Sequence, residues 1–341
     1  MQANFFDLDN RHQKLNERDT LIWLDQIIHW EEFRETLQRC RNKPRKNKAG
    51  RKPFDVVMMF KALVLQHLYN LGDDELEFQI RDRYSFCRFL KLTPEDRVPD
   101  AKTLWLFREQ LTQQGLVKAL FNDFDLQLQE KGFKAQKGQI IDASFISAPI
   151  QRNSREENDE IKAGNIPKSF EENPNVKRQK DCDARWTKKN NEKHYGYKDH
   201  IAIDNAHTLI RDYEVTSAEV HDSQVFFELL SENSSKDVWA DSAYRSEEHE
   251  ILLEADNYRS HVHTKGKRNQ PLNDREKEAN RKRSKTRARV EHVFGSMENE
   301  QGGMFIRVIG LARAKAKIGL MNLAYNIRRC VSLSRIRPSA A

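Results

Sequence analysis

The sequence predicts a mixed α/β protein whose first third is all helical. Up to about residue 130, apolar residues recur at helical spacing behind residues that commonly cap helices. From about residue 133 onward, short segments rich in Ile, Val, Tyr and Thr alternate with helical stretches, as in a mixed sheet with flanking helices. We therefore divide the chain into a helical N-terminal domain at residues 1–130, an α/β domain at 131–335 and a tail at 336–341.

Helices account for the first domain. Residues 54–72 are strongly apolar and end at Gly72, a stop signal, so we expect a buried helix there. Three aspartates are expected to cap further helices. They are Asp19, before residues 20–40, Asp74, before residues 75–92, and Asp100, before residues 101–111. Short capped helices of this kind are shared by helix-turn-helix DNA-binding domains and by purely structural bundles.

Strands dominate the second domain. Five are predicted, at residues 138–150, 194–204, 208–217, 237–244 and 258–264. Two helices are expected between the later strands: residues 221–233, capped by Asp222 or Ser223, and residues 246–257, capped by Ser246. The polar and basic segment 150–193 has few apolar residues and carries two prolines, so we expect a mobile insertion rather than a domain.

The composition narrows the class of protein. The chain has a formal net charge of +7, and much of its basic excess lies in separate runs at residues 39–52, 176–198 and 281–289. Clustered cations are typical of a surface that binds a polyanion such as nucleic acid, although any one run could simply be solvated. No apolar run approaches the roughly 18 residues of a membrane helix, and no signal peptide is evident, so we expect a cytoplasmic protein. The four cysteines are far apart and form no CxxC pair, which indicates neither a disulfide framework nor a zinc knuckle.

Two aspartates follow apolar strand residues. Asp142 comes after "GQII" and Asp241 after "VWA", and a buried unpaired carboxylate is costly. If the two strands are neighbours, both acids converge at the edge where open α/β sheets commonly bind ligands. Converging carboxylates repel one another unless a cation lies between them, and magnesium or manganese suits oxygen ligands. Two such ions roughly 3.5–4 Å apart can catalyse phosphoryl transfer.

A third acid ends the last basic run. Glu291 lies one helical turn after Arg287, at the margin of an apolar stripe. The stripe consists of Val290, Val293, Phe294 and Met297. Glu291 would therefore face the boundary between core and cleft and could complete a metal site, while the preceding cations hold a phosphodiester backbone. The alternative is a surface pair between Arg287 and Glu291, worth a few tenths of a kcal/mol.

Four segments together resemble a known family. In chain order they are "IIDAS", "HYGYKDHIAID", "VWADSAYRS" and "TRARVEHVFG". They look like the catalytic core of DDE transposases of bacterial insertion sequences, with the insertion sequence five family as the best match, and the resemblance spans roughly residues 50–335. It implies a ribonuclease-H-like mixed sheet with flanking helices, preceded by an all-helical domain for DNA binding and dimerisation.

The resemblance also implies an activity. Asp142, Asp241 and Glu291 would be the catalytic metal ligands, holding two Mg²⁺ ions for which Mn²⁺ could substitute. The protein would bind terminal inverted repeats as a homodimer or higher oligomer on the bacterial nucleoid, cleave double-stranded DNA at the element ends and join 3′ hydroxyls to target DNA. A related signature has a Tyr and a Lys where this chain has Ser284 and Glu298, so roles assigned to those two residues do not carry over.

The sequence leaves open which residues contact DNA, whether zinc binds, and which of three functions the protein has. DNA contacts are expected from a set of basic residues: Arg51, Lys52, Lys198, Arg281, Lys282, Arg283, Lys285 and Arg287. A zinc site is a weaker alternative, because its candidate histidines lack a recognised ligand spacing. These are His194, His200, His261 and His263. A catalytically silent DNA-binding regulator and a ribonuclease-H-like nuclease or resolvase are the competing functions.

Overall fold

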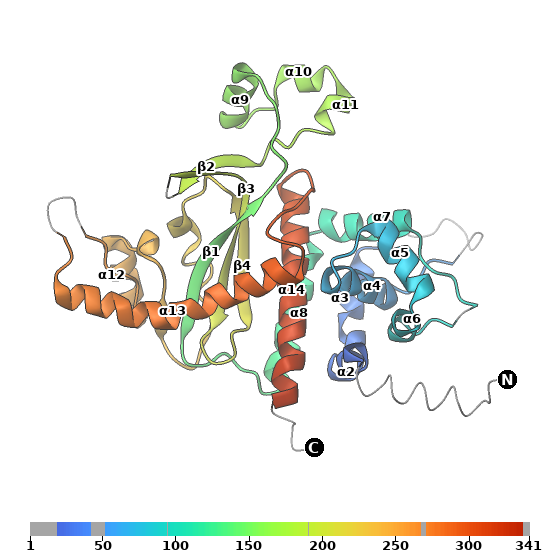
Figure 1. The fold of residues 1–341 in the computed structure, drawn as a ribbon, viewed down its shortest axis with the longest axis horizontal. Coiled ribbons are helices and arrows are strands. Elements are labelled where there is room, and N and C mark those ends of the chain that lie inside the picture. Colours follow the sequence, from blue (N-terminus) through green and yellow to red (C-terminus); the bar gives the residue numbers. More distant parts are fainter. Residues whose placement is uncertain (1–18, 42–51, 94, 190, 267–270, 337–341) are drawn as a thin grey trace. The chain divides into compact units, whose positions relative to one another are not determined.

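The computed structural model describes residues 19–41, 52–93, 95–189, 191–266 and 271–336 (Figure 1). Contacts divide the chain into two compact units. One comprises the chain up to Gln127 together with the stretch from Ile327, and the other is Leu128–Asn326. None of the described helices is long and apolar enough to cross a membrane.

The first unit is helical. Its elements are α2 (Thr20–Ile27), the 3₁₀ turn η1 (Trp30–Phe33), α3 (Arg34–Arg39), α4 (Val56–Leu68), α5 (Asp73–Asp82), α6 (Tyr84–Leu90), α7 (Ala101–Gln113) and α8 (Leu116–Glu130), whose last turn lies in the second unit. Every residue of α4 is buried, as its apolar sequence predicts. Asp55 caps α4 by accepting hydrogen bonds from the backbone N–H groups of Val57 and Met58.

Two of the three predicted caps are confirmed. Asp19 accepts a hydrogen bond from Leu21 N, and Asp100 accepts one from Thr103 N. The third is wrong, because α5 begins at Asp73, with Gly72 at the N-cap position and no side-chain cap. Acids in the first turn favour this start through the helix dipole.

The helix predicted over residues 20–40 is broken. The chain becomes extended at Ile28, and the backbone N–H of His29 donates to the side chain of Gln127. This side-chain bond replaces the helical bond that the backbone of His29 would otherwise make. Periodicity alone cannot detect such a break, since the apolar spacing continues through η1 and α3.

The second unit contains one six-stranded mixed sheet. Its strands are β1 (Gln139–Ser147), β2 (Arg185–Lys189), β3 (Glu192–Asp204), β4 (Ile210–Ser217), β5 (Asp237–Trp239) and β6 (Arg259–Ser260). Antiparallel pairs join β1 to β3 and β3 to both β2 and β4, whereas β1, β5 and β6 are parallel neighbours. This is the ribonuclease-H-like arrangement that the sequence predicts. All five predicted strands are present, but the last two are shorter than predicted, with three residues in β5 and two in β6. Strand β2 is an additional one.

Helices complete the second unit. They are α9 (Arg155–Lys162), α10 (Lys168–Glu171), α11 (Pro174–Lys177), η2 (Asp222–Val225), η3 (Ser242–Tyr244), α12 (Glu247–Ala255), α13 (Asp274–Glu300) and α14 (Leu311–Ile336), whose C-terminal end lies in the first unit. The predicted cap of α12 is confirmed, since Ser246 accepts a hydrogen bond from His249 N. The helix predicted over residues 221–233 is wrong in length and cap. Only η2 forms, capped by His221, because Asp222 is buried in an ion pair with Lys198.

The insertion between β1 and β3 contains regular structure. Helices α9, α10 and α11 lie beyond β2 at one end of the sheet (Figure 1). A capping box of Ser154 and Glu157 begins α9, and the side chains of Ile161 and Phe170 are buried. These few apolar anchors are enough to hold a segment that is otherwise polar.

The two faces of the sheet are covered differently. On one face, Ile141 of β1 and Val238 of β5 belong to a core cluster. Its other members include Phe226, which follows η2, Tyr244 of η3 and Leu253 of α12. Residues that alternate with these point to the opposite face. There α13 crosses the sheet in front of β1 (Figure 1) and packs against β1 and β5. Asp142, next to Ile141, therefore faces α13.

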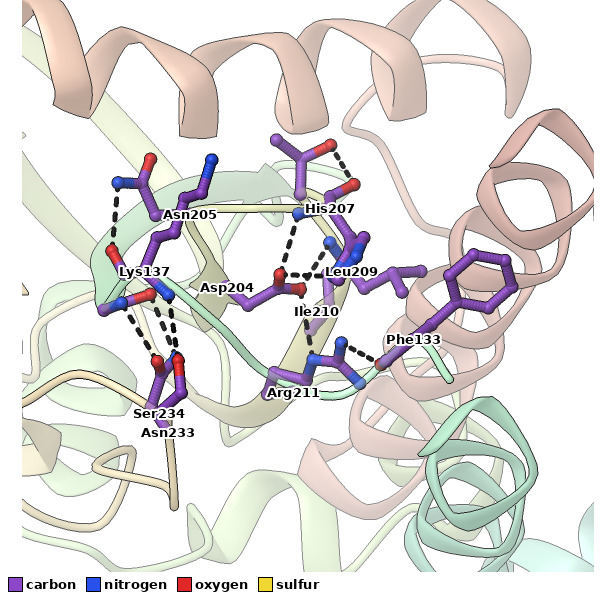
Figure 2. A network of polar contacts seen from close by, with 12 residues as sticks. Phe133, Lys137, Asp204, Asn205, His207, Leu209, Ile210, Arg211, Asn233 and Ser234 are labelled. Carbon is purple, nitrogen blue, oxygen red and sulfur yellow. Dashed lines mark hydrogen bonds and ion pairs between the residues drawn. The ribbon is translucent and has the colours of Figure 1, made fainter. Parts of the chain in front are cut away.

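A buried carboxylate fixes the turn that positions α13. Figure 2 shows Asp204, at the end of β3, accepting hydrogen bonds from the backbone N–H groups of His207 and Leu209 and from Arg211 Nε, at 2.8, 3.2 and 3.1 Å. Asn205, in this turn, accepts from Arg289 of α13 through its carbonyl and side-chain oxygens. The turn thus links the register of α13 to that of the sheet.

His200 makes the stability of the second unit depend on pH. Its ring is buried, its Nε2 lies 2.9 Å from Thr216 Oγ1, and burial lowers its pKa from 6.5 to about 4. Between these two pH values the His200 ring is protonated in the unfolded chain but neutral in the folded chain. The free energy of unfolding therefore falls by roughly 2–3 kcal/mol as the pH drops from about 6.5 to about 4. Replacing His200 by Gln should flatten this fall, measured by urea unfolding at pH 7 and pH 4.5. An equal fall in parent and variant would contradict the assignment.

Candidate active site

Two carboxylates face each other across the middle of the sheet. Strands β1 and β5 pair in parallel, with Gln139 opposite Val238 and Ile140 opposite Trp239. Continuing this register by two residues sets Asp142 opposite Asp241, which comes after the end of β5. Because β1 and β5 are neighbours, Asp142 and Asp241 converge as the sequence predicts for neighbouring strands.

Arg287 of α13 lies between the two carboxylates. Its Nη2 is 3.1 Å from Asp142 Oδ2, and its Nη1 is 3.7 Å from Asp241 Oδ1. The side chains of Asp142 and Arg287 are only 13% and 17% exposed, whereas that of Asp241 is 32% exposed. Within the described residues Arg287 Nε has no hydrogen-bond partner. The single guanidinium of Arg287 thus forms ion pairs with both aspartates, while its Nε–H group donates no hydrogen bond to the described residues.

Burial dominates the electrostatics of this group. It raises the pKa of Asp142, against the opposing effects of the Arg287 charge and of the hydrogen bond from Ala143 N. Burial alone would lower the pKa of Arg287, but the charges of Asp142 and Asp241 outweigh it and the net shift is upward. Asp241 accepts a 2.6 Å hydrogen bond from Ser242 N as the cap of η3. The backbone therefore fixes both carboxylates, and their position favours a cation.

Glu291 lies one turn beyond Arg287 on α13, and its side chain is exposed. Its charge contributes to the raised pKa of Arg287. Arg287 forms its ion pairs with Asp142 and Asp241 and, among the described residues, forms none with Glu291, so the surface pair considered from the sequence is absent. Across the described part of the chain, no three His, Cys, Asp or Glu side chains are close enough together to hold a metal ion.

Comparison with known protein families identifies the family of this chain. A family profile described as "Transposase DDE domain" matches residues 134–327, more than half of the chain. The chain belongs to the DDE transposase family. A second profile, "Transposase domain (DUF772)", matches residues 9–110. One solved structure, titled "Cryo-EM structure of piggyBac transposase synaptic complex with hairpin DNA (SNHP)", aligns at 12% identity and a TM-score of 0.43, covering 92% of this chain and 75% of that one.

The basic residues expected to contact DNA fall into different environments in this transposase. Lys282 and Lys285 of α13 are exposed, and in the described residues neither has an ion-pair partner. Arg281 is exposed and pairs with Glu278 at 2.9 Å. Arg283 instead points inward and donates to the carbonyl of Val262 at 2.9 Å.

The remaining DNA-contact candidates lie away from α13. Lys198 is buried, donating to the carbonyl of Val220 and pairing with Asp222 at 2.8 Å, so its ammonium already has partners. Lys52 is exposed, and Arg51 lies outside the described residues. The basic run at residues 39–52 is for the most part also outside them.

The histidines considered as zinc ligands have different contact partners. His194 stacks on Phe145 with ring centroids 4.1 Å apart, and His261 lies 2.8 Å from an oxygen of Asp237. His263 is close to the acidic pair, since its Nδ1 is 4.0 Å from Asp241 Oδ1 and its Nε2 is 3.4 Å from Ser284 Oγ. Burial and the charge of Arg287 lower the pKa of His263, which favours a neutral ring beside the carboxylates.

Sequence reasoning missed one buried core tyrosine on which the charge of Asp142 acts. Tyr244 of η3 is fully buried, and its hydroxyl has no hydrogen-bond partner among the described residues. Burial and the nearby charges of Asp142 and Asp222 raise its pKa well above the usual value, so it stays protonated. The only sequence signal was its position three residues after Asp241, in a stretch interpreted as strand.

Proposed function

We propose that this transposase binds the terminal inverted repeats of a bacterial insertion sequence of the insertion sequence five family. It would cleave double-stranded DNA at the element ends and join the 3′ hydroxyls to target DNA. The observation that carries the proposal is that Asp142 of β1 and Asp241, just beyond the parallel neighbour β5, both contact Arg287, which lies one helical turn from Glu291. Paired carboxylates on neighbouring strands suit metal-assisted phosphoryl transfer.

The donor set fits a hard divalent cation. Asp142 Oδ2 and Asp241 Oδ1 already converge on the guanidinium of Arg287, and carboxylate oxygens are the ligands that Mg²⁺ and Mn²⁺ prefer. We assign Asp142, Asp241 and Glu291 as ligands of two Mg²⁺ ions, for which Mn²⁺ would substitute. When bound, such ions activate a water or sugar hydroxyl and stabilise the leaving oxygen.

Backbone N–H groups and basic side chains around the two aspartates would orient the carboxylates and bind the DNA backbone. The backbone N–H groups of Ala143 and Ser242 orient the two aspartates. Arg287 would turn from the carboxylates to a DNA phosphate, for which its planar guanidinium is suited. The exposed cations of α13, Arg281, Lys282 and Lys285, would hold the phosphodiester backbone beside the acids.

Two features of the assembly follow from the substrate. Two element ends must be handled together, so we propose a homodimer or higher homo-oligomer on DNA. The substrate would place the protein on the bacterial nucleoid. The helical first unit, through Lys52 and the basic run before it, would contribute to DNA binding and dimerisation.

The exposed cations of α13 should set the salt dependence of DNA binding. Replacing Arg281, Lys282 and Lys285 together by Gln removes up to three phosphate contacts, so the slope of log K against log salt should become less negative by about 2–3. Fluorescence anisotropy with an end-DNA duplex at several salt concentrations measures this. Arg283→Gln is the control, because that side chain points inward. A slope that the triple substitution leaves unchanged would show that these cations are merely solvated.

Cleavage of end DNA separates the competing functions. The protein is incubated with duplexes carrying the element ends or scrambled ends, with Mg²⁺ or with EDTA. Transposase activity requires metal-dependent cuts at the true ends and transfer of their 3′ hydroxyls to a second DNA. Binding without cuts would establish the regulator, and equal cutting of both duplexes would establish the nuclease.

A further inference from the structure

A pocket lies between the insertion and the hairpin of β2 and β3, away from the acidic pair. It has a volume of about 860 Å³, and its wall includes Ile161 of α9, Trp186 of β2 and Tyr195 of β3. A volume in this range suits a small ligand or part of a polymer. None of these residues takes part in the proposed chemistry, so the pocket needs a separate explanation.

An exposed aromatic ring forms one wall of this insertion pocket. Trp186 is 46% exposed, although it is a large apolar side chain on an ordered strand. It lies directly opposite Tyr195 in the β2–β3 register, and the two rings have centroids 5.0 Å apart at an angle of 42°. Tyr195 is only 8% exposed. The tyrosine thus holds the indole in place, while much of the indole surface stays open to the pocket.

Cations surround this ring. Lys188 and Lys193 lie opposite each other in the same register, two residues from Trp186 and Tyr195, so all four side chains share one face of the hairpin. Arg155 of α9 lines the same pocket. Among the described residues, Arg155, Lys188 and Lys193 have no ion-pair partner.

The acids that line the pocket are already engaged. Asp159 lies 3.8 Å from Lys162 Nζ, and Glu219 lies 3.2 Å from Arg185 Nε. Asp181 accepts a 2.7 Å hydrogen bond from the hydroxyl of Tyr197. The pocket lining carries five cations, Arg155, Lys162, Arg185, Lys188 and Lys193, against these three acids, so its net charge is positive and complements an anionic ligand.

The insertion pocket shares a sheet face with the acidic pair. Asp142 lies opposite Ile201 of β3, and Tyr195 precedes Ile201 by six residues, so alternation sets Tyr195 and Asp142 on the same face. At about 3.3 Å per residue the two points are roughly 20 Å apart along β3. One strand of DNA, with about 3.4 Å per nucleotide, would span this distance in about six nucleotides.

We propose that the insertion pocket binds an unpaired base of the DNA substrate, stacked on Trp186, with the flanking phosphates held by Lys188 and Lys193. An exposed aromatic face among unpaired cations matches the combination by which proteins bind single-stranded nucleic acid. A base that is still paired in a duplex presents no open face for such stacking. The inference rests on the proposed function only in taking DNA as the substrate.

Single-strand affinity tests this inference without any cleavage. The full-length protein is titrated, in EDTA, into a fluorescein-labelled single-stranded oligonucleotide and into the duplex of the same sequence. Replacing Trp186 by Ala should weaken single-strand binding by roughly 5- to 150-fold, while Trp186→Phe, which keeps an aromatic face, should retain most of it. Duplex affinity should change by less than about twofold. Ile166→Ala is the control, because Ile166 is an exposed apolar residue of the insertion that does not line the pocket.

The lysines provide a second, independent measurement. Replacing Lys188 and Lys193 by Gln should make the single-strand salt slope less negative by about 1.4, since each lost phosphate contact contributes about 0.7. Unchanged single-strand binding in Trp186→Ala would overturn the inference. Equal losses on single strand and duplex would do the same, because they would show a general effect on the protein. A parent protein that cuts duplex ends but binds no single strand would overturn the pocket assignment and leave the proposed function intact.

Discussion

Replacing Asp142 by Asn should lower the rate of strand cleavage at element ends by about 10³-fold, because a metal-assisted step supplies several kcal/mol of transition-state stabilisation. DNA affinity in EDTA should stay within about twofold of the parent, since the side chain is only 13% exposed and is held by Arg287 rather than by solvent contacts. Single-turnover cleavage of end DNA in Mg²⁺ or Mn²⁺ measures the rate. Anisotropy with the same duplex measures the affinity.

The other two acids should behave in the same way. Asp241→Asn and Glu291→Gln should each cause a loss of similar size, and the losses should not add, because the three residues act as a unit. Glu298→Gln is the matched control, since Glu298 is also an exposed glutamate on α13. Cleavage by Glu291→Gln at the rate of Glu298→Gln would remove Glu291 from the site.

Replacing Arg287 by Gln should lower the free energy of unfolding of the metal-free protein by about 3 kcal/mol. The substitution removes the one charge that Asp142 and Asp241 share and leaves two facing carboxylates, one of them largely buried. Urea unfolding in EDTA at pH 7.5 measures the loss. Arg281→Gln is the control, because its pair with Glu278 is exposed and should contribute less than about 1 kcal/mol.

Divalent metal should reverse much of this loss. If the metal takes the place of the Arg287 guanidinium, Mn²⁺ should raise the melting temperature of Arg287→Gln more than that of the parent, in which metal and arginine compete for the same oxygens. The concentration of Mn²⁺ for half the effect should also be lower in the variant. Equal shifts in both proteins would show that Arg287 and the metal do not compete.

The sequence predicted the sheet and the position of the two aspartates. Short segments rich in Ile, Val, Tyr and Thr identified the regions of β1 and β5, and the apolar residues before each acid pointed to Asp142 and Asp241. Asp241 follows the end of β5, whereas Asp142 lies inside β1. The apolar stripe of α13 is also confirmed at Val290, Val293 and Met297, which are buried. These features follow from local periodicity, which a single sequence displays directly.

Contacts between distant segments were not predictable in the same way. The bridge from Arg287 to Asp142 joins residues 145 positions apart, and no local pattern marks it. Lys198 looked like a phosphate ligand in a basic run, yet the fold buries it against Asp222. Strand β2 was missed because its residues, Arg185–Lys189, are mostly charged, and it is held by pairing with β3 rather than by an apolar face of its own.

Iron-directed cleavage of the polypeptide tests most directly whether Asp142, Asp241 and Glu291 surround one divalent metal site. Fe²⁺ replaces Mg²⁺ in the protein bound to end DNA, and ascorbate with peroxide then generates hydroxyl radicals that cut the backbone near the metal. We expect cuts close to all three acids in the parent and loss of all three in Asp142→Asn. Cuts near Asp142 and Asp241 without any near Glu291, or a pattern that Asp142→Asn leaves unchanged, would contradict the assignment.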